Sequence, residues 1–465
     1  MQTELTLNSP QEKKRFYKDL ARITLPIAFQ NFMDACVNSA DVVMLTMVGK
    51  TELAAASLAS KVAFVLQMLL FGVSSGASIL SAQYWGSKDR RTIEKVLMIS
   101  VRLSVGISLL FSLAAWFCPA AIMRIFTPDQ ALIEAGVGYL RAVSASYVLN
   151  GFAVVYLSVM RSVERVRMSA AVHSSAVVLN VVLNACFIFG VGFFPKLGIV
   201  GVALATSITR FLEVIVCSID AARCKIIKLR IRDFLLREKA LMREFFRYSI
   251  PAALNDTIWG LAFSVYAVIL GHLSSDIVAA DSVASVVRTL CTVVCFGVSS
   301  AAAIMLGKTM GENRLADARV HAGRFLRMSV YTALAGGVII LLIRPFVLSS
   351  MHLMVDVNPV VERYTSLMLY INAYYIMGQS VNTMLICGIF RAGGDVRFGL
   401  VCDAIAMWGY AVPIGLLCAF VLRLPEMWVY FILCLDEFVK MPVIIAHYKK
   451  GTWLRNLTLN AEKKD

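Results

Sequence analysis

The sequence predicts an all-α integral membrane protein with twelve transmembrane helices in two six-helix lobes. Only 16% of the 465 residues are charged and 59% are hydrophobic, whereas an ordinary soluble domain is about 25% charged. The mean hydropathy is +0.73. Charge-poor apolar stretches recur along the whole chain, each long enough to cross about 30 Å of hydrocarbon as a helix. The chain also repeats itself.

The repeat is clearest in the pentapeptide FGVSS, which occupies residues 71–75 and returns at 296–300. Pro26 and Pro251 are separated by the same offset, and Arg161 and Arg391 by one that is slightly longer. A tandem duplication with a small insertion in one loop explains this agreement. Because each half crosses the membrane an even number of times, the halves are expected to be parallel repeats related by an axis along the membrane normal.

Apolar runs bounded by charges or turn residues define the individual helices. The expected spans lie at 20–46, 53–80, 93–119, 131–159, 168–190, 197–222, 244–271, 277–305, 316–343, 358–387, 396–420 and 427–447. The parts that follow are a cytoplasmic tail at 1–19, an N-terminal six-helix lobe at 20–222, a basic amphipathic cytoplasmic linker at 223–243, a C-terminal six-helix lobe at 244–447 and a cytoplasmic tail at 448–465.

The Lys and Arg residues set the orientation. Of the 45, 34 lie in the termini, in alternate connections and in the span ends that adjoin them, and only six lie in or beside the other loops. Cytoplasmic loops carry such an excess, so both termini are predicted to be cytoplasmic in a multi-pass protein of the plasma (inner) membrane. No signal peptide is expected before the first span. The net charge of +15 then indicates contact with an anionic inner leaflet, above all by the linker, and no nucleic-acid partner.

Neither the 11 cysteines nor any other motif points to an enzyme. The cysteines are scattered, mostly within apolar spans, and form no CxxC pair, as expected of small buried hydrophobes. The chain has no metal-ligand cluster, nucleophile elbow or phosphate loop, and no cofactor is expected. A passive channel is also disfavoured, because the polar residues within the spans are single buried carboxylates on paired helical bundles.

The first helix carries a polar stripe. Asn31, Asp34, Asn38 and Asp41 follow a spacing of three, four and three residues, which places them on one helical face. Such a face cannot meet lipid, because a charge at mid-bilayer costs about 2.5–3.5 kcal/mol on insertion scales. The stripe is either a hydrogen-bonded packing surface or a site that binds a proton or another cation.

Helices 5 and 6 continue the polar surface of the first half. Asn180 and Asn184 share a face of helix 5 with His173, which we interpret as a satisfied histidine rather than a ligand. Helix 6 offers Thr206. It also contains Arg210 and Glu213, which we interpret as a structural ion pair near the cytoplasmic end.

The second half carries polar residues on several of its helices. They are Asn255, Asp256 and Trp259 on helix 7, Arg288 on helix 8, Gln379 and Asn382 on helix 10, and Asp403 on helix 11. Asp256 and Arg288 occupy similar depths in consecutive antiparallel helices and are predicted to pair. Asp436 and Lys440 are predicted to form an i, i+4 pair. The two halves most simply turn their polar faces toward a central cavity that receives a small-molecule substrate.

Several segments together resemble the multidrug and toxic compound extrusion (MATE) family. They are LPIAFQNFMDACVNSADVVMLTMVG, AQYWG at 82–86, NVVLNACFIFG at 180–190, LGIVGVALATSITR at 197–210 and FRAGGDVRFG at 390–399. The resemblance implies two six-helix lobes in a V-shape with a central cavity. It also implies a monomeric antiporter that exports organic cations or amphipathic compounds by alternating access, driven by entry of H⁺ or Na⁺.

The resemblance also implies a site for the coupling ion. Asp41 matches the family's helix 1 aspartate, Asn180 its helix 5 asparagine and Thr206 its helix 6 threonine, whereas Asn184 stands where some members have a second aspartate. The family's acidic site in the C-terminal lobe is not matched, because Trp259 and Gln379 lie near its positions. A related fold leaves one alternative open, a flippase for a lipid-linked precursor, which would require a strongly cationic cavity.

Overall fold

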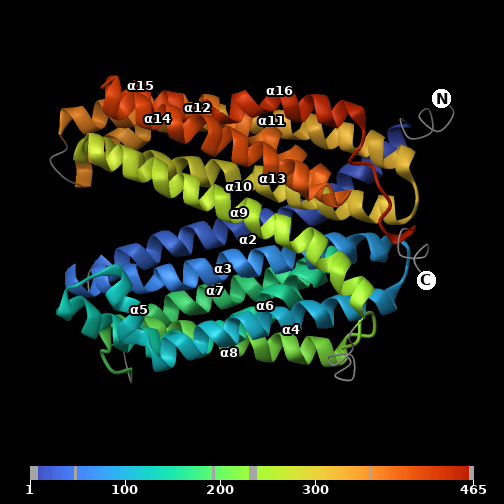
Figure 1. Ribbon diagram of the computed structural model, residues 1–465, viewed down its shortest axis with the longest axis horizontal. Helices are drawn as coiled ribbons and strands as arrows, with labels where there is room; N and C mark the ends of the chain where they lie inside the picture. The colour runs from blue at the N-terminus through green and yellow to red at the C-terminus, as the bar shows by residue number, and fades with distance from the viewer. Residues whose placement is uncertain (1–8, 47–49, 191–193, 230–237, 355–357, 460–465) are drawn as a thin grey trace. The chain divides into compact units, whose positions relative to one another are not determined.

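The computed structural model describes residues 9–46, 50–190, 194–229, 238–354 and 358–459, with the side chains of 38–43, 45, 46, 50, 51 and 352–354 excepted. Within these ranges the chain consists of helices and their connections and contains no strand (Figure 1). The fold class predicted from the sequence, an all-α membrane protein, is confirmed.

Helices of the first half follow the predicted spans closely. They are α2 (Pro10–Thr46), α3 (Lys50–Gly86), α4 (Arg90–Phe117), the short α5 (Pro119–Phe126), α6 (Gln130–Ser162), α7 (Val166–Phe189) and α8 (Gly198–Arg223). The first helix begins ten residues before its predicted span, within the expected tail. Of the expected linker, the last residues belong to α9, and residues 230–237 lie outside the described part of the chain.

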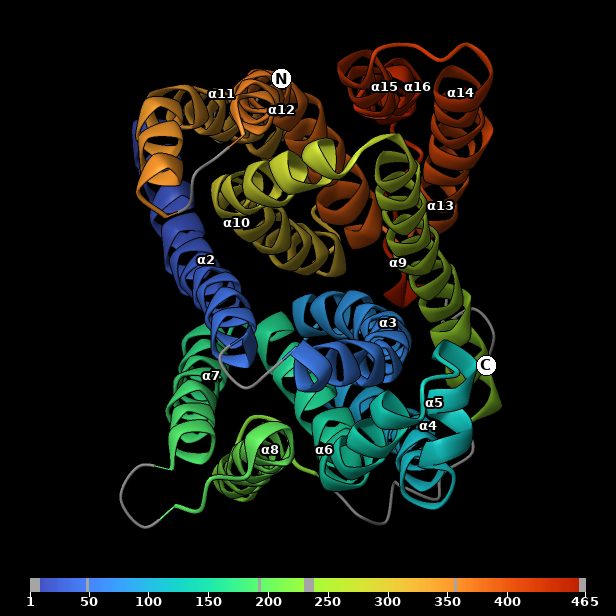
Figure 2. The same ribbon diagram turned by 90° about the vertical axis from the view of Figure 1, so that its left-hand side faces the viewer.

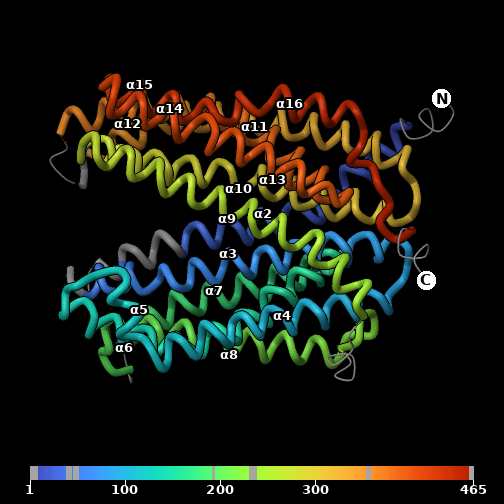
Figure 3. Tube along the Cα trace, viewed as in Figure 1, coloured from blue at the N-terminus to red at the C-terminus, as the bar shows by residue number. Residues whose placement is uncertain are grey.

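The second half repeats this series with more interruptions. It comprises α9 (Lys239–Leu273), α10 (Ser275–Gly311), α11 (Leu315–Met354), α12 (Pro359–Thr383), η2 (Met384–Phe390), α13 (Val396–Ala404), η3 (Ile405–Ala411), α14 (Val412–Leu416), η4 (Leu417–Val421), α15 (Glu426–Leu433) and α16 (Asp436–Lys450). The η segments are wide π-type turns. From α13 to η4 they continue one helical run, with Pro413 inside it (Figure 3).

Side-chain caps fix where several helices begin. The carboxylates of Asp89 and Asp129 accept hydrogen bonds from backbone N–H groups in the first turns of α4 and α6, at 3.0 and 2.9 Å. Ser274 and Asn358 cap α10 and α12 in the same way. These residue types satisfy N–H groups that a helix start leaves without a partner. At these four helices the predicted and observed starts agree within a few residues.

The turns between helices preserve the duplication. Lys88 and Asn313, which are separated by the offset of the FGVSS repeat, both have left-handed backbones, with φ of 63° and 60°. Glu164 and Gly394, which are separated by the longer offset, do the same with φ of 64° and 73°. Each turn makes the same pair of backbone hydrogen bonds in both halves. Both offsets found in the sequence therefore correspond to equivalent local structure.

Nine helices in the described part are long and apolar enough to cross a membrane. The three remaining predicted spans correspond to α2, to α12 with η2, and to α15 with α16. The first two carry polar side chains along their length. The third divides at a turn between Leu433 and Asp436. Each of the twelve predicted spans thus coincides with a helix or a consecutive helical run.

Backbone contacts divide the chain into two compact units. The first-repeat unit is Phe29–Ala253, and the second-repeat unit is Met1–Ala28 with Leu254–Asp465. The boundaries fall inside α2 and α9, in each case two residues after the internal proline, Pro26 or Pro251. The units therefore differ from the predicted lobes: the start of each lobe's first helix packs with the other repeat.

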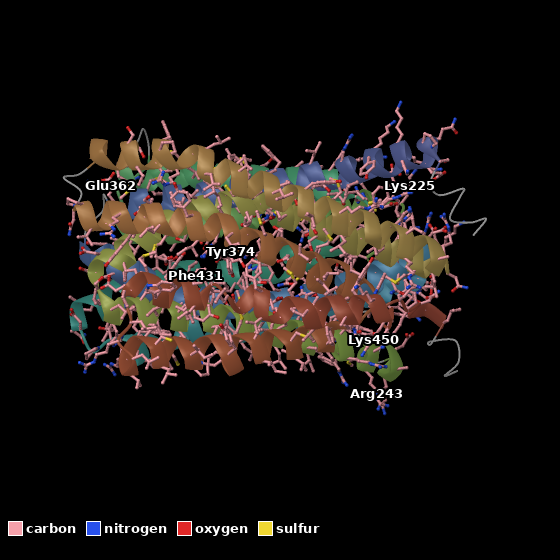
Figure 4. All side chains as sticks on the ribbon, turned by 90° about the horizontal axis from the view of Figure 1, so that it is seen from above. Lys225, Arg243, Glu362, Tyr374, Phe431 and Lys450 are labelled. Carbon is pink, nitrogen blue, oxygen red and sulfur yellow. The ribbon has the colours of Figure 1, made fainter. Side chains whose placement is uncertain are left out.

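Each unit is a helical bundle with equivalent neighbours. In the first-repeat unit α6 packs against α3, α4 and α8, and in the second-repeat unit α12 packs against α10 and α11 (Figure 2). Along the second-repeat unit, Glu362 and Lys450 lie at opposite ends, with Tyr374 and Phe431 between them (Figure 4). The charged ends and the apolar middle match what a helix needs to cross a bilayer.

The repeated FGVSS motif allows close helix packing. An added methyl group at Gly72 would overlap the backbone and Cβ of Ala253 on α9. At the equivalent Gly297 an added Cβ would lie 3.2 Å from the Cβ of Ala28 on α2. In both repeats the motif's glycine therefore lets α3 or α10 approach the crossing segment of the other repeat's first helix.

Gly72→Ala is expected to destabilise the protein by about 1–3 kcal/mol, because the new methyl group meets backbone that cannot move aside. The measurement is the thermal midpoint of the purified protein in detergent. The matched control is Gly106→Ala on α4, where an added Cβ meets nothing within 4 Å. Equal midpoints for both variants would contradict this account of the motif.

Candidate functional site

Ionisable side chains of the first-repeat unit form one connected chain. His173 on α7 lies between two carboxylates: its Nε2 is 3.0 Å from Oδ1 of Asp34, and its Nδ1 is 3.2 Å from Oε1 of Glu213. Arg210 donates to the other oxygen of Glu213 at 2.6 Å. The guanidinium of Arg161, at the end of α6, interacts electrostatically with Asp34. These five residues are called the first polar cluster below.

Three of the four predicted coupling-ion residues meet in the same unit. The Asn180 amide donates to the Thr206 hydroxyl at 3.4 Å, and the Asn184 amide donates to the Asn180 carbonyl oxygen at 3.2 Å. Asn184 is buried. This chain of amide and hydroxyl oxygens joins α7 to α8 and offers neutral oxygen ligands to a small cation.

The polar stripe of α2 is described only in part. Asn31 and Asp34 are half-buried in the first-repeat unit, and Asp34 contacts His173 as stated above. The side chains of Asn38 and Asp41 lie outside the described residues. In the part of the chain that the structure describes, no three His, Cys, Asp or Glu residues group as metal ligands would.

Buried and half-buried charges of the second-repeat unit form a second network. Arg391 donates to Asp256 at 2.7 Å and to Asn255 at 3.3 Å. The amide of Asn255 donates to Asp403 at 2.8 Å. Asp403 also accepts from Lys440 at 2.8 Å, and Lys440 lies 3.1 Å from Glu437. These six residues are called the second polar cluster.

The structure corrects one predicted ion pair and changes the direct partners in a second. Asp256 binds Arg391 and not Arg288, because the helical run through η2 carries the Arg391 guanidinium to α9. The predicted spans end at 387 and resume at 396, so the sequence places Arg391 in the connection between them. Lys440 makes its direct contacts with Asp403 and Glu437 and interacts with Asp436 only electrostatically; the Asp436 carboxylate accepts from the backbone N–H of Glu437.

The other predicted residues of the second half lie near this cluster or in a separate pocket. Asn382 donates to the Glu437 carboxylate at 2.8 Å, and Gln379 is buried one turn before it. Arg288 donates to Asn372 at 3.4 Å and lies over the ring of Tyr375. Trp259 packs edge-on against a phenylalanine of its own helix.

Arg288 also lines a cavity of about 60 Å³ inside the second-repeat unit. Its other lining residues are aromatic, apolar or acidic: Phe263, Tyr266, Ala267, Leu270, Asp281, Tyr375, Tyr430, Leu433 and Cys434. A cavity of this size holds a few water molecules at most, and not an organic substrate.

The two polar clusters occupy equivalent places in the duplicated fold. His173 and Asp403 are separated by the longer repeat offset, like the starts of their helices, Val166 and Val396. Each contacts an i, i+3 ion pair on the sixth helix of its repeat. The pair's order is reversed, so His173 meets the acid of one pair and Asp403 meets the base of the other. Duplication preserved the location while the signs of charge were exchanged.

Comparison with known proteins places this architecture in a family. The sequence model of the MatE family matches residues 26–186 and 251–417, which are the two repeats. The chain belongs to the MATE family of efflux transporters. The resemblance seen in the sequence motifs is confirmed, and the protein is a transporter and not an enzyme.

The relatives match over nearly their whole length. The uncharacterized transporter YisQ of Bacillus subtilis is 20% identical over 438 residues, which are 94% of this chain and 95% of YisQ. A probable multidrug resistance protein NorM of Thermotoga maritima is 20% identical, covering 97% of this chain and 96% of its own. A solved outward-facing multidrug resistance MATE transporter has a TM-score of 0.83 at 18% identity, covering 93% and 95% of the two chains.

Sequence reasoning missed two members of the second polar cluster in this MATE protein, Arg391 and Glu437, and did not find the direct partners of Lys440. One signal was available for Arg391. It aligns with Arg161 at the repeat offset, so both arginines end the fourth helix of a repeat, near an acid of that repeat's first helix. The partners of Glu437 and Lys440 could not be predicted, because the sequence of a polar helix does not show which neighbouring helix each side chain contacts.

Asp256→Ala and Arg391→Ala are each expected to lower the folded yield, since each leaves a half-buried charge without its partner; with 26% and 15% of the two side chains exposed, the cost should be smaller than that of a fully buried pair, about 3–5 kcal/mol. The double variant should recover part of the loss, because neither charge then remains alone. The measurement is a double-mutant cycle on the yield of monodisperse protein and on its thermal midpoint. Additive effects in the double variant would show that the two residues act independently.

Proposed function

We propose that this MATE protein is a secondary active antiporter that exports small organic compounds, cationic or amphipathic, in exchange for H⁺ or Na⁺ by alternating access. The observation that carries the proposal is the first polar cluster, in which Asp34 on α2 contacts His173, and His173 contacts Glu213; the last two lie on helices long and apolar enough to cross a membrane. Ionisable groups are expensive there and mark ion pathways in transporters.

The coupling ion is assigned to Asp41 together with Asn180, Asn184 and Thr206, which supply a carboxylate and neutral oxygen ligands. Asn31, Asp34 and Asn38 form the polar stripe that leads to it. The substrate is assigned to the polar residues of the second-repeat unit: Asn255, Asp256, Trp259, Arg288, Gln379, Asn382 and Asp403. The protein functions as a monomer in the plasma (inner) membrane with both termini in the cytoplasm.

The charge pattern supports export over the flippase alternative. A flippase for a pyrophosphate-linked precursor requires cations that are free to bind phosphate. Arg210, Arg391 and Lys440 each contact a carboxylate of their own unit instead. Such matched pairs leave little positive charge for an anionic head group.

The test is ethidium efflux from cells that produce the protein, with the pH gradient and the sodium gradient collapsed separately. The proposal expects efflux to stop when one of the two gradients is removed. Loss with the pH gradient alone assigns H⁺, and loss with the sodium gradient alone assigns Na⁺. Efflux that survives removal of both gradients would contradict secondary antiport.

A further inference from the structure

His173 is held between two carboxylates, and whether both contacts can form depends on the number of protons at the site. Both ring nitrogens lie within hydrogen-bond distance of a carboxylate oxygen, at 3.0 Å from Asp34 and 3.2 Å from Glu213. The side chain of Glu213 is fully buried, that of His173 is 17% exposed and that of Asp34 is 37% exposed. The three groups come from α2, α7 and α8, so the contacts join three helices.

A neutral imidazole cannot satisfy both contacts. It has one N–H donor and one lone pair, and ionised carboxylates are acceptors only. With one proton on the ring, one nitrogen would therefore turn its lone pair toward a carboxylate oxygen, which is repulsive. Two hydrogen bonds require a second proton at the site. The geometry of Asp34, His173 and Glu213 is that of a site with this proton bound.

The surrounding charges place the extra proton on the imidazole. Arg210 on α8 forms an ion pair with Glu213, and Arg161 on α6 interacts electrostatically with Asp34, so each carboxylate has a cation nearby, whereas both imidazole nitrogens face carboxylates, which favour a positive charge on the ring. One more titratable group lies near Glu213: the thiol of Cys217, one turn later on α8, interacts electrostatically with the Glu213 carboxylate. An imidazolium donates to both acids and satisfies every contact.

We propose that the first polar cluster is a proton-binding site in which His173 carries the proton, and that loss of the proton releases α2 from α7. The Nε2–H bond breaks, its electron pair remains on Nε2, and the proton passes to water at the exposed Asp34. The link to transport rests on the proposed antiport function. The proton site itself rests on the contacts alone.

When His173 loses its proton, the contact that breaks is the one between its Nε2 and Asp34. Glu213 is fully buried, keeps its ion pair with Arg210 and still accepts from the Nδ1–H of neutral His173. Asp34 is the more exposed carboxylate, so water can replace its lost hydrogen bond. Because Asp34 lies on α2, protonation of one imidazole controls whether this helix is tied to α7.

The equivalent place in the second-repeat unit needs no such proton. Asp403 stands at the position of His173 and accepts from two permanent donors, the Lys440 ammonium at 2.8 Å and the Asn255 amide at 2.8 Å. Its contacts are complete without a group that titrates near neutral pH. At this pair of equivalent positions, the exchange of charges therefore makes the contact proton-dependent at His173 and proton-independent at Asp403.

The test is a ¹⁵N NMR titration of the histidine side chains in the full-length protein in nanodiscs, from about pH 5 to pH 9. Imidazolium and the two neutral tautomers give distinct ¹⁵N shifts. His173→Gln identifies the resonance. We expect His173 to be an imidazolium at low pH and to become the Nδ1–H tautomer as pH rises. A neutral His173 over the whole range would overturn the proposal.

Asp34→Asn is the decisive variant. The Asn amide can donate to the Nε2 lone pair, so both contacts form without the extra proton, and the midpoint of the His173 titration should fall by about one pH unit or more. Glu213→Gln should also lower the midpoint of the His173 titration, and this variant replaces Asp34→Asn in the test if Asp34→Asn does not fold. An unchanged midpoint in a folded variant of either kind would refute the site.

His272→Gln is the matched control. His272 is exposed on α9, bonds a backbone carbonyl of its own helix at 2.9 Å and lies edge-on to the ring of Phe420, with no carboxylate contact among the described residues, so its removal should leave the His173 titration unchanged. Ethidium efflux against external pH then tests the link to transport: Asp34→Asn should remove the pH dependence. If the wild type moves no ethidium under any gradient, the proposed function fails while the titration still decides the proton site.

Discussion

Lys440→Met is expected to lower the stability of the protein by about 3–5 kcal/mol and to abolish most of its folded yield. The Lys440 side chain is 4% exposed, and its ammonium contacts Asp403 and Glu437, which are also buried. Methionine fills a similar volume but leaves both carboxylates without their shared cation. The measurement is the yield of monodisperse protein together with its thermal midpoint in detergent.

Two further variants separate this effect from a general loss of packing. Lys450→Met, at the exposed end of the same helix, should change neither quantity. Adding Asp403→Asn to Lys440→Met should restore part of the stability, because it removes one of the two buried carboxylates that Lys440→Met leaves without a counter-charge. If Lys450→Met is as harmful as Lys440→Met, the buried ion pairs are not the cause.

Asp41→Asn is expected to abolish ion-coupled export while the protein remains folded and inserted. The amide keeps the shape and hydrogen-bonding capacity of the side chain but cannot titrate. The measurement is ethidium efflux at matched amounts of membrane-inserted protein. Asp19→Asn, the same change at an exposed position of α2, is the control and should transport like the wild type.

The same assay distinguishes the two candidate ion sites on α2. Asp41 lies seven residues beyond Asp34, about 10.5 Å further along the helix. Efflux at the wild-type rate in Asp41→Asn, together with loss of the pH dependence in Asp34→Asn, would move the coupling ion from Asp41 to the first polar cluster. Loss of export in Asp41→Asn alone would keep the assignment made from the family motif.

The order and length of the helices could be predicted from the sequence. Crossing a bilayer requires about 20 apolar residues that satisfy their own backbone hydrogen bonds, so each span can be recognised from its own stretch of sequence. The duplication can likewise be recognised from short motifs, because the glycine of FGVSS and the turns at Lys88 and Asn313 serve the same packing and turn geometry in both repeats.

Part of the candidate site was also predictable. The spacing of Asn180 and Asn184 placed them on one face of a helix, and the structure joins them to Thr206. Helical periodicity states which face a residue occupies. It does not state which neighbouring helix that face meets, so Asp256 was paired with the wrong arginine.

The sequence by itself determined an all-α membrane protein, its repeated six-helix pattern and the polar positions within its spans. Only the tertiary structure decided the partners: Asp256 with Arg391, Lys440 with Asp403, and His173 between Asp34 and Glu213. The physical reason is that these contacts join helices distant in the chain. A buried charge must find an opposite charge, and several residues of each sign lie within reach until packing selects one.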